Sequence, residues 1–251
     1  MKRVALFLLT NFAVLLVLGV VLSILLPVLG LEQGSSSELF FICAIFGIGG
    51  SFIFLAMSKW IAKRGVGAHV IEAPANELQS WLVNTVSKQA RQAGIGMPEV
   101  AIYDAAEINA FATGMSRNNA LVAVSSGLLN RLSRDEAEAV LGHEVSHIAN
   151  GDMIKLTLIQ GVLNTFGFFF ARIAASAISR GNDNRFFYFM TVMASHAPLG
   201  VLASVIAMWF SSQREYRADA GGVVLAGKQK MISPLQKLQS ASQESSLDGA
   251  A

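Results

Sequence analysis

Four long apolar runs constrain the fold of this chain more than any other feature of its sequence. They cover residues 4–29, 39–57, 156–178 and 186–210. A helix needs roughly 20 predominantly apolar residues to cross the hydrocarbon core of a bilayer. Charged residues make up 14% of the chain, whereas soluble domains contain about 25%. The sequence therefore predicts a mainly α membrane protein with four hydrophobic helices.

The basic residues around the first two runs predict the orientation of the chain. Two of them precede the first run and three follow the second, while the loop at 31–38 has none. Because Lys and Arg accumulate on the cytoplasmic side of a membrane, we expect the N-terminus and the chain after the second run to lie there. The net charge of +2 indicates no nucleic-acid partner, so the lipid bilayer is the expected surroundings. The basic residues are Lys2, Arg3, Lys59, Lys63 and Arg64.

Polar groups in the later runs leave two interpretations open. Gln160 and Asn164 lie on one helix face of the third run, and His196 and Pro198 interrupt the fourth. These groups either face other helices or reach the interface by snorkelling, or else the hairpin enters the bilayer incompletely or lines a polar cleft for substrate. In the second run, closely spaced glycines beginning at Gly47 predict the close approach of another helix.

The segment between the second and third runs has the composition of a soluble α+β domain. An amphipathic pattern predicts a helix at 76–93, and short apolar runs predict strands at 100–103 and 120–124. Residues 108–114 fit a strand or a loop, and residues 127–132 fit a short helix or a turn.

The end of this segment carries the motif H-E-x-x-H. Positions i and i+4 share one face of a helix, so His143 and His147 can offer two imidazoles to one metal ion, with Glu144 beside them. A capping-box pattern at Ser133 predicts where that helix begins, and residues 150–152 predict its end. Two imidazoles and a carboxylate suit zinc, and three protein ligands leave the open position of a catalytic site.

The third ligand is expected after the fourth run, on the same side of the membrane. Glu215 and Asp219 share a helix face, so one can ligate zinc while the other accepts a hydrogen bond from a ligating histidine. Glu215 is the predicted ligand and Asp219 the supporting group. Asp152 is a weaker candidate, because it lies too close to the end of the metal helix to fold back easily. An ordinary charged juxtamembrane helix, with Arg214 and Arg217, is the alternative to this site.

The motifs H-E-V-S-H and R-E-Y-R-A-D, separated by a hydrophobic hairpin, resemble those of the HtpX family of bacterial membrane zinc metalloproteases. The two N-terminal runs and the segment Asn109-Ala110-Phe111-Ala112-Thr113-Gly114 extend the resemblance over nearly the whole chain. It implies one zinc ion per chain, a location in the bacterial inner membrane, and stress-related cleavage of damaged membrane proteins on the cytoplasmic side. It also implies that Glu215 is the third ligand and that Asn109, Ala110 and Phe111 lie beside the substrate. Family members usually carry a further cytoplasmic segment with a His-Pro-Pro element, which does not occur before Ala251.

The resulting organisation is a membrane anchor with a cytoplasmic α+β zincin-like metalloprotease domain. We expect two N-terminal transmembrane helices at 1–60, the catalytic domain at 61–155, a hydrophobic hairpin at 156–210, a cytoplasmic helix with the third ligand at 211–239 and a flexible tail at 240–251.

The predicted reaction is hydrolysis of a peptide bond. Glu144 takes the proton of the attacking water and passes it to the leaving amine, while an extended peptide pairs with a sheet edge. The oxyanion partner stays open among His69, Tyr216 and Arg217. Protein or peptide substrates are expected, with self-cleavage in the tail as a further possibility.

Two alternative functions are a catalytically silent membrane scaffold with a structural zinc ion and a metal transporter. Glu144 argues against the scaffold, because a structural zinc site has no use for a general base. The position of the candidate ligands outside the apolar runs argues against the transporter.

Overall fold

The computed structural model of the chain describes residues 20, 24, 28, 35–178 and 185–230. The chain divides into two compact units. One unit contains the chain up to Leu55 together with Lys155–Ser212, and the other contains Ala56–Ile154 together with the chain from Gln213 onward.

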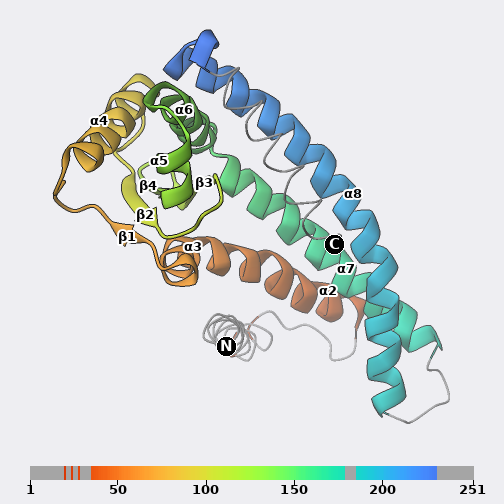
Figure 1. Ribbon diagram of the computed structural model, residues 1–251. Coiled ribbons are helices and arrows are strands. Elements are labelled where there is room, and N and C mark those ends of the chain that lie inside the picture. The colour runs from red at the N-terminus through yellow and green to blue at the C-terminus, as the bar shows by residue number, and fades with distance from the viewer. Residues whose placement is uncertain (1–19, 21–23, 25–27, 29–34, 179–184, 231–251) are drawn as a thin grey trace, which may run out of the picture. The chain divides into compact units, whose positions relative to one another are not determined.

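The described part of the first unit is helical. Two continuous helical stretches, Ser36–Val66 and Asp152–Ile178, are long and apolar enough to cross a membrane, and they coincide with the predicted second and third runs. The predicted first run lies almost entirely outside the described residues. The fourth run is part of one long helix that contains Pro198, and within the described residues Phe186–Ser195 is an apolar helical stretch of it. The helices are α2 (Ser36–Ala44), a π-helical turn η1 (Ile45–Gly49), α3 (Gly50–Val66), α7 (Asp152–Ile178) and α8 (Arg185–Ala226) (Figure 1).

Close packing within this unit occurs at Gly47. A Cβ atom placed there would overlap Thr165 Oγ1 and would lie 2.8 Å from Gly161 O, so the predicted close approach of two helices at this glycine is confirmed. Farther along α7, Gln160 Nε2 donates to Asn164 Oδ1 at 2.9 Å. These two side chains line a cavity of about 160 Å³ whose other wall comes from α8. Gln160 and Asn164 of the third run therefore line a cavity. Whether a substrate enters this cavity is not tested, so that interpretation stays a prediction.

The second unit contains a four-stranded sheet in the order β1-β2-β4-β3. β2 and β4 run parallel, whereas β1 pairs antiparallel with β2 and β3 pairs antiparallel with β4. β3 therefore forms an edge of the sheet. The strands are β1 (His69–Val70), β2 (Glu99–Tyr103), β3 (Ala110–Ser116) and β4 (Asn119–Ser125).

The helices of this unit are the final part of α3 from Ala56 onward, α4 (Glu77–Gln92), α5 (Ser126–Arg131), α6 (Arg134–Asn150) and the final part of α8. The predicted helix at 76–93 and both predicted strands are confirmed. The two open segments resolve as strand β3 and helix α5. The two-residue strand β1 was not predicted, because a strand that short has no detectable alternation.

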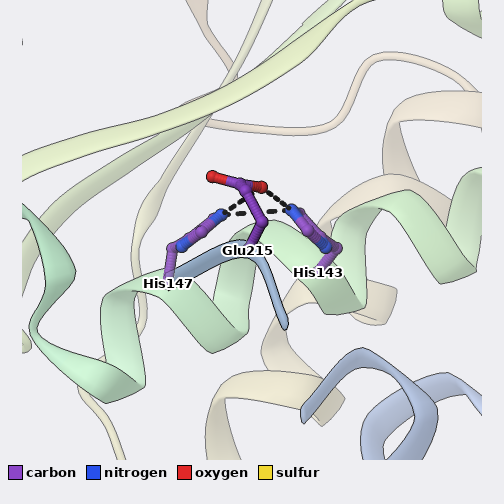
Figure 2. A group of neighbouring side chains, drawn as sticks. All are labelled: His143, His147 and Glu215. Carbon is purple, nitrogen blue, oxygen red and sulfur yellow. Dashed lines mark hydrogen bonds and ion pairs between the residues drawn. The ribbon is translucent and has the colours of Figure 1, made fainter. Parts of the chain in front are cut away.

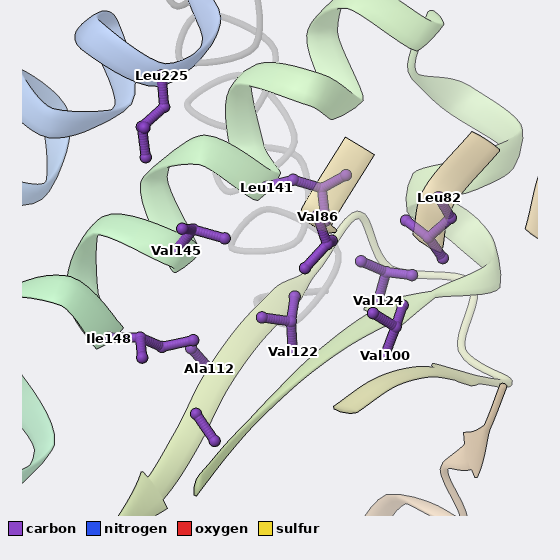
Figure 3. Close-up of a cluster of buried hydrophobic side chains, with 11 residues drawn as sticks. Leu82, Val86, Val100, Ala112, Val122, Val124, Leu141, Val145, Ile148 and Leu225 are labelled. Atoms are coloured by element: carbon purple, nitrogen blue, oxygen red, sulfur yellow. The ribbon is translucent and has the colours of Figure 1, made fainter. Parts of the chain in front are cut away.

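A hydrophobic core fixes α4 and α6 against one face of the sheet (Figure 3). Val122 and Val124 of β4 contribute to it, as do Leu141 and Val145 of α6, and all four side chains are fully buried. Burying one such side chain is worth about 1.5–3 kcal/mol. Leu225 of α8 joins the same cluster, so the end of α8 belongs to this core.

The alternate residues of β4 face the other side of the sheet. Leu121 and Ala123 are also fully buried and pack with Tyr103, Val66 and Phe111. Because successive strand residues point to opposite faces, burial on both faces explains why β4 is apolar along most of its length.

Candidate metal centre

The sequence around α6 fixes both ends of the helix that carries the candidate ligands. Ser133 Oγ accepts from the Glu136 backbone N–H at 3.3 Å, and the Glu136 carboxylate accepts from the Ser133 N–H at 2.9 Å. This reciprocal pair is the predicted capping box. The helix ends at Gly151, whose φ of 67° lies in the left-handed region that favours glycine. The predicted boundaries of the helix are thus confirmed.

Three side chains from α6 and α8 converge on one point (Figure 2). The Nε2 atoms of His143 and His147 are 3.1 Å apart. Glu215 Oε2 lies 3.2 Å from His143 Nε2 and 3.5 Å from His147 Nε2. A tetrahedral zinc ion with bonds of about 2.0–2.1 Å would separate its ligand atoms by roughly 3.3 Å. The donor set and its spacing therefore fit a tetrahedral metal ion with one position left open.

The Nδ1 atom of each histidine, which faces away from the cluster, contacts a carboxylate of its own. His143 Nδ1 lies 2.9 Å from Asp219 Oδ1, and His147 Nδ1 lies 2.8 Å from Asp152 Oδ2. If each Nδ1–H donates to its carboxylate, each Nε2 lone pair points into the cluster. Metal-ligating histidines usually show this arrangement, since it fixes the tautomer and the orientation of the ring.

The prediction that Asp152 lies too near the helix end to fold back is wrong. The left-handed turn at Gly151 reverses the chain directly after α6, and Asp152 reaches the last ligand-bearing turn. Its side chain is 2% exposed, and it supports His147 and does not join the ligand group. The sequence signal was the adjacent Gly-Asp pair at the helix stop, which we interpreted only as an end signal.

The surroundings of His143 favour its neutral form. Burial lowers its pKa, as does the neighbouring His147, although the Asp219 and Glu215 carboxylates oppose this shift. An imidazole must be neutral to bind a metal ion. The lowered pKa of His143 therefore favours metal binding over protonation of this ring.

The carboxyl group of Glu144 interacts with Glu215 of the metal cluster and with the Ala112 backbone of the edge strand β3. Loss of solvent around its carboxyl group raises its pKa to about 8, and the nearby Glu215 charge adds to this effect. A hydrogen bond from the Ala112 backbone of β3 and the charge of Arg214 act in the opposite direction. A divalent cation beside the carboxyl group would also lower this pKa. The sequence indicates Arg214 only as a charge of an ordinary juxtamembrane helix, but its Nη2 atom lies 3.3 Å from Glu215 Oε1.

The segment with Asn109, Ala110 and Phe111 leads into the edge strand. The Asn109 carbonyl accepts from Ser125 N at 2.9 Å, and Asn109 N donates to Ser125 Oγ at 3.1 Å, which fixes the start of β3 on β4. The ring of Phe111 packs against that of Tyr103, with 5.7 Å between the ring centroids, on the sheet face away from α6. Within the described chain, β3 pairs with a strand on one side only.

Comparisons with known proteins give the family of the chain. Residues 76–247 match the model of Peptidase family M48. The chain is 61% identical over 260 residues to Protease HtpX of Aeromonas hydrophila, covering 100% of this chain and 89% of that protein. It is 57% identical over 253 residues to Protease HtpX of Idiomarina loihiensis, covering 99% and 88%.

A solved structure shares the fold. The crystal structure of S. mikatae Ste24p superposes with a TM-score of 0.65 at 19% sequence identity, covering 95% of this chain. The chain spans 59% of the length of that structure, so this likeness concerns the fold alone.

Fold, site and relatives together define a membrane-associated metalloprotease. The chain belongs to Peptidase family M48 and, by its relatives, to the HtpX proteases. The catalytically silent scaffold is accordingly not favoured, and the protein is a metal-dependent hydrolase of peptide bonds.

Proposed function

We propose that this protein is a zinc-dependent endopeptidase of the bacterial inner membrane that cleaves damaged or misfolded membrane proteins on the cytoplasmic side. The convergence of His143, His147 and Glu215, with ligand atoms spaced as tetrahedral zinc requires, is the observation that carries the proposal. Zinc is favoured over harder cations, because two of the three ligands are imidazoles.

His143, His147 and Glu215 would hold the ion, with Asp219 and Asp152 orienting the two rings. When bound, zinc supplies polarisation of the scissile carbonyl and a lowered pKa for water. Glu144 takes the proton of the attacking water on its carboxylate and delivers it to the leaving amine nitrogen. Burial raises the pKa of Glu144, which favours its holding the proton. The bound cation would lower this pKa and so favour the carboxylate form that accepts the proton.

The substrate backbone would pair with the edge strand β3. Asn109, Ala110 and Phe111 stand at its start, and the Ala112 backbone already contacts Glu144. Pairing along this edge places an extended peptide beside the proposed base and gives affinity with little dependence on side chains. Low sequence preference suits a protease that removes damaged proteins.

The proposed membrane arrangement has four hydrophobic helices, with the segments at 61–155 and 211–239 in the cytoplasm. The basic residues flanking the first two runs support it. An impermeant thiol reagent tests it in intact spheroplasts, on a Cys43→Ala background. A single cysteine at Ser36 should react from outside, whereas one at Ser87 should not. Labelling at Ser87 alone would refute the orientation.

Self-cleavage is proposed in the segment after Ser240, which lies outside the described residues. Purification without a chelator should yield C-terminally shortened protein, and Glu144→Gln should abolish the shortening. Equal shortening in both proteins would show that a different protease is responsible.

Casein cleavage by the detergent-solubilised protein is the direct test of the function. A chelator should abolish cleavage, and zinc added in slight excess over the chelator-treated protein should restore it. Neither a scaffold with a structural zinc ion nor a transporter would cleave. Zinc binding at one ion per chain without any cleavage of unfolded proteins would overturn the proposal.

A further inference from the structure

The last part of α8 crosses α6 at an unusually short distance, and a glycine stands at the contact. A Cβ atom added to Gly221 would overlap Ser146 Oγ and would lie 2.8 Å from Ser146 Cβ. One turn earlier on α6, a Cβ atom at Gly142 would lie 3.5 Å from Gly222 O and 3.4 Å from Ala226 Cβ. All these residues belong to the second unit. The two helices thus meet through side chains that are absent or small.

Ser146 cannot easily move out of the way. It is 3% exposed, and its hydroxyl donates to the Gly142 carbonyl at 2.8 Å. Its neighbours in the chain, Val145 and His147, are themselves buried in the core and in the metal cluster.

The backbone of Gly221 does not require a glycine, because it is helical and its φ is not positive. Glycine inside a helix is less stable than alanine. The residue at this position is therefore explained by the space available and not by the conformation of the chain.

The contact lies directly beside the metal ligands. Ser146 precedes His147 by one residue, and Gly221 follows Asp219 by two and Glu215 by six. The distance between the helices at this crossing therefore sets how far Glu215 stands from the two imidazoles. We propose that Gly221 is a positioning residue for the metal site, and that its close fit on Ser146 holds the third ligand within reach of the ion.

The size of the effect follows from the missing space. An ordinary contact begins at 3.4 Å, so a methyl group at Gly221 requires the helices to separate by about 0.6 Å, if Ser146 Cβ alone is considered. Metal–ligand distances tolerate deviations of about 0.2 Å. Gly221→Ala should therefore weaken zinc binding to a degree typical of lost support around a metal, roughly ten- to a hundredfold.

A reciprocal substitution tests this directly in the detergent-solubilised full chain. Ser146→Gly removes both atoms that a Gly221 side chain would meet, and the remaining Ser146 Cα lies at 3.9 Å. We therefore expect the double variant Gly221→Ala/Ser146→Gly to recover most of the lost zinc affinity. Gly65→Ala, in a helix with no atom within 4 Å of the new Cβ, is the matched control and should bind zinc as the wild type does.

The readouts separate positioning from folding. They are the zinc dissociation constant from competition with a chelating dye, the visible spectrum of the Co²⁺-substituted protein, and the thermal unfolding of the metal-free protein. Gly221→Ala should change the zinc dissociation constant and the Co²⁺ spectrum far more than the thermal unfolding. If Gly221→Ala unfolds, the double variant Gly221→Ala/Ser146→Gly keeps the test decisive, because it should fold and bind zinc as tightly as Ser146→Gly alone.

The inference rests on the proposed zinc site, and its failure is distinguishable from the failure of that site. A wild-type protein that binds no zinc refutes the proposed function. Wild-type zinc binding with an unchanged dissociation constant in Gly221→Ala refutes only the positioning role. A loss in Gly221→Ala that Ser146→Gly does not restore also refutes it, because the contact with Ser146 would then not be the cause.

Discussion

The metal site consists of two halves that the chain builds in different ways. The proximal half, with His143, Glu144, His147 and Asp152, comes from ten consecutive residues on and just after α6. The distal half, with Glu215 and Asp219, arrives on α8 more than sixty residues later. Helix geometry places His143, Glu144 and His147 near one another, and the turn at Gly151 adds Asp152. The distal half depends on how α8 packs against α6.

This difference also appears in solvent exposure. The carboxylate that supports His147 in the proximal half is 2% exposed, whereas the one that supports His143 from the distal half is 37% exposed. Glu215 is 45% exposed by its side chain. The proximal half is thus built into the protein core, and the distal half lies at its boundary.

The largest effect is expected in the proximal half, from Glu144→Gln. The amide keeps the size of the side chain but cannot accept the proton of water. The rate of casein cleavage should fall by roughly a hundredfold to ten-thousandfold, with zinc stoichiometry unchanged. Glu77→Gln, whose side chain is 83% exposed on α4, is the matched control. A wild-type rate in Glu144→Gln would mean that another group is the base, and loss of zinc would make Glu144 a ligand or a support.

In the distal half, Glu215→Ala should weaken zinc binding more than any other substitution there. It removes a metal bond and a negative charge, whereas Asp219→Ala removes a supporting contact worth about ten- to a hundredfold in affinity. Metal titration of both variants measures the order. The reverse order would exchange the roles of the two carboxylates.

The difference between the two halves, local in one and long-range in the other, also determines what could be predicted from the sequence. Helix α6 was predictable at both ends, because a capping box and a left-handed glycine are local signals. Strand β4 was predictable from its apolar run, although not its position between β2 and β3, which results from long-range pairing.

Prediction was weaker wherever backbone reversal or helix packing was decisive. The contact of Asp152 with His147 depends on the turn at Gly151, which a helix-face pattern does not show. The pairing of Glu215 with the motif required a topological argument and a family resemblance. The fit of Gly221 on Ser146 left no pattern in the sequence, because a single glycine does not reveal its neighbour.

Replacing each supporting carboxylate by its amide sharpens the comparison. Asp152→Asn should reduce zinc affinity by close to a hundredfold, and Asp219→Asn by closer to tenfold, within the usual range for such partners. The amide oxygen can still accept from the histidine Nδ1–H, but the negative charge is lost. Water compensates for the lost charge more at the half-exposed Asp219 than at the buried Asp152. Dissociation constants for both variants test this. A larger loss in Asp219→Asn would show that the exposed half governs metal affinity.

The smallest effect on zinc affinity is expected from a substitution of Lys230, which lies just after the end of α8. Its Nζ atom lies 2.7 Å from both Asp135 Oδ1 and Glu138 Oε2 on α6. These pairs link the chain beyond Glu215 to the start of the metal helix. Exposed ion pairs are worth about 0.2–1 kcal/mol, so Lys230→Met should weaken zinc binding by at most about fivefold.

Ionic strength distinguishes this contribution from the packing at Gly221. Salt screens exposed charges over about 8 Å at physiological strength and about 3 Å at 1 M. The difference in zinc affinity between wild type and Lys230→Met should therefore shrink in 1 M salt, whereas the loss in Gly221→Ala should persist. Lys228→Met, in the same exposed segment, controls for the loss of one positive charge. A salt-independent loss in Lys230→Met as large as that in Glu215→Ala would mean that the ion pairs, and not the helix packing, hold the distal half in place.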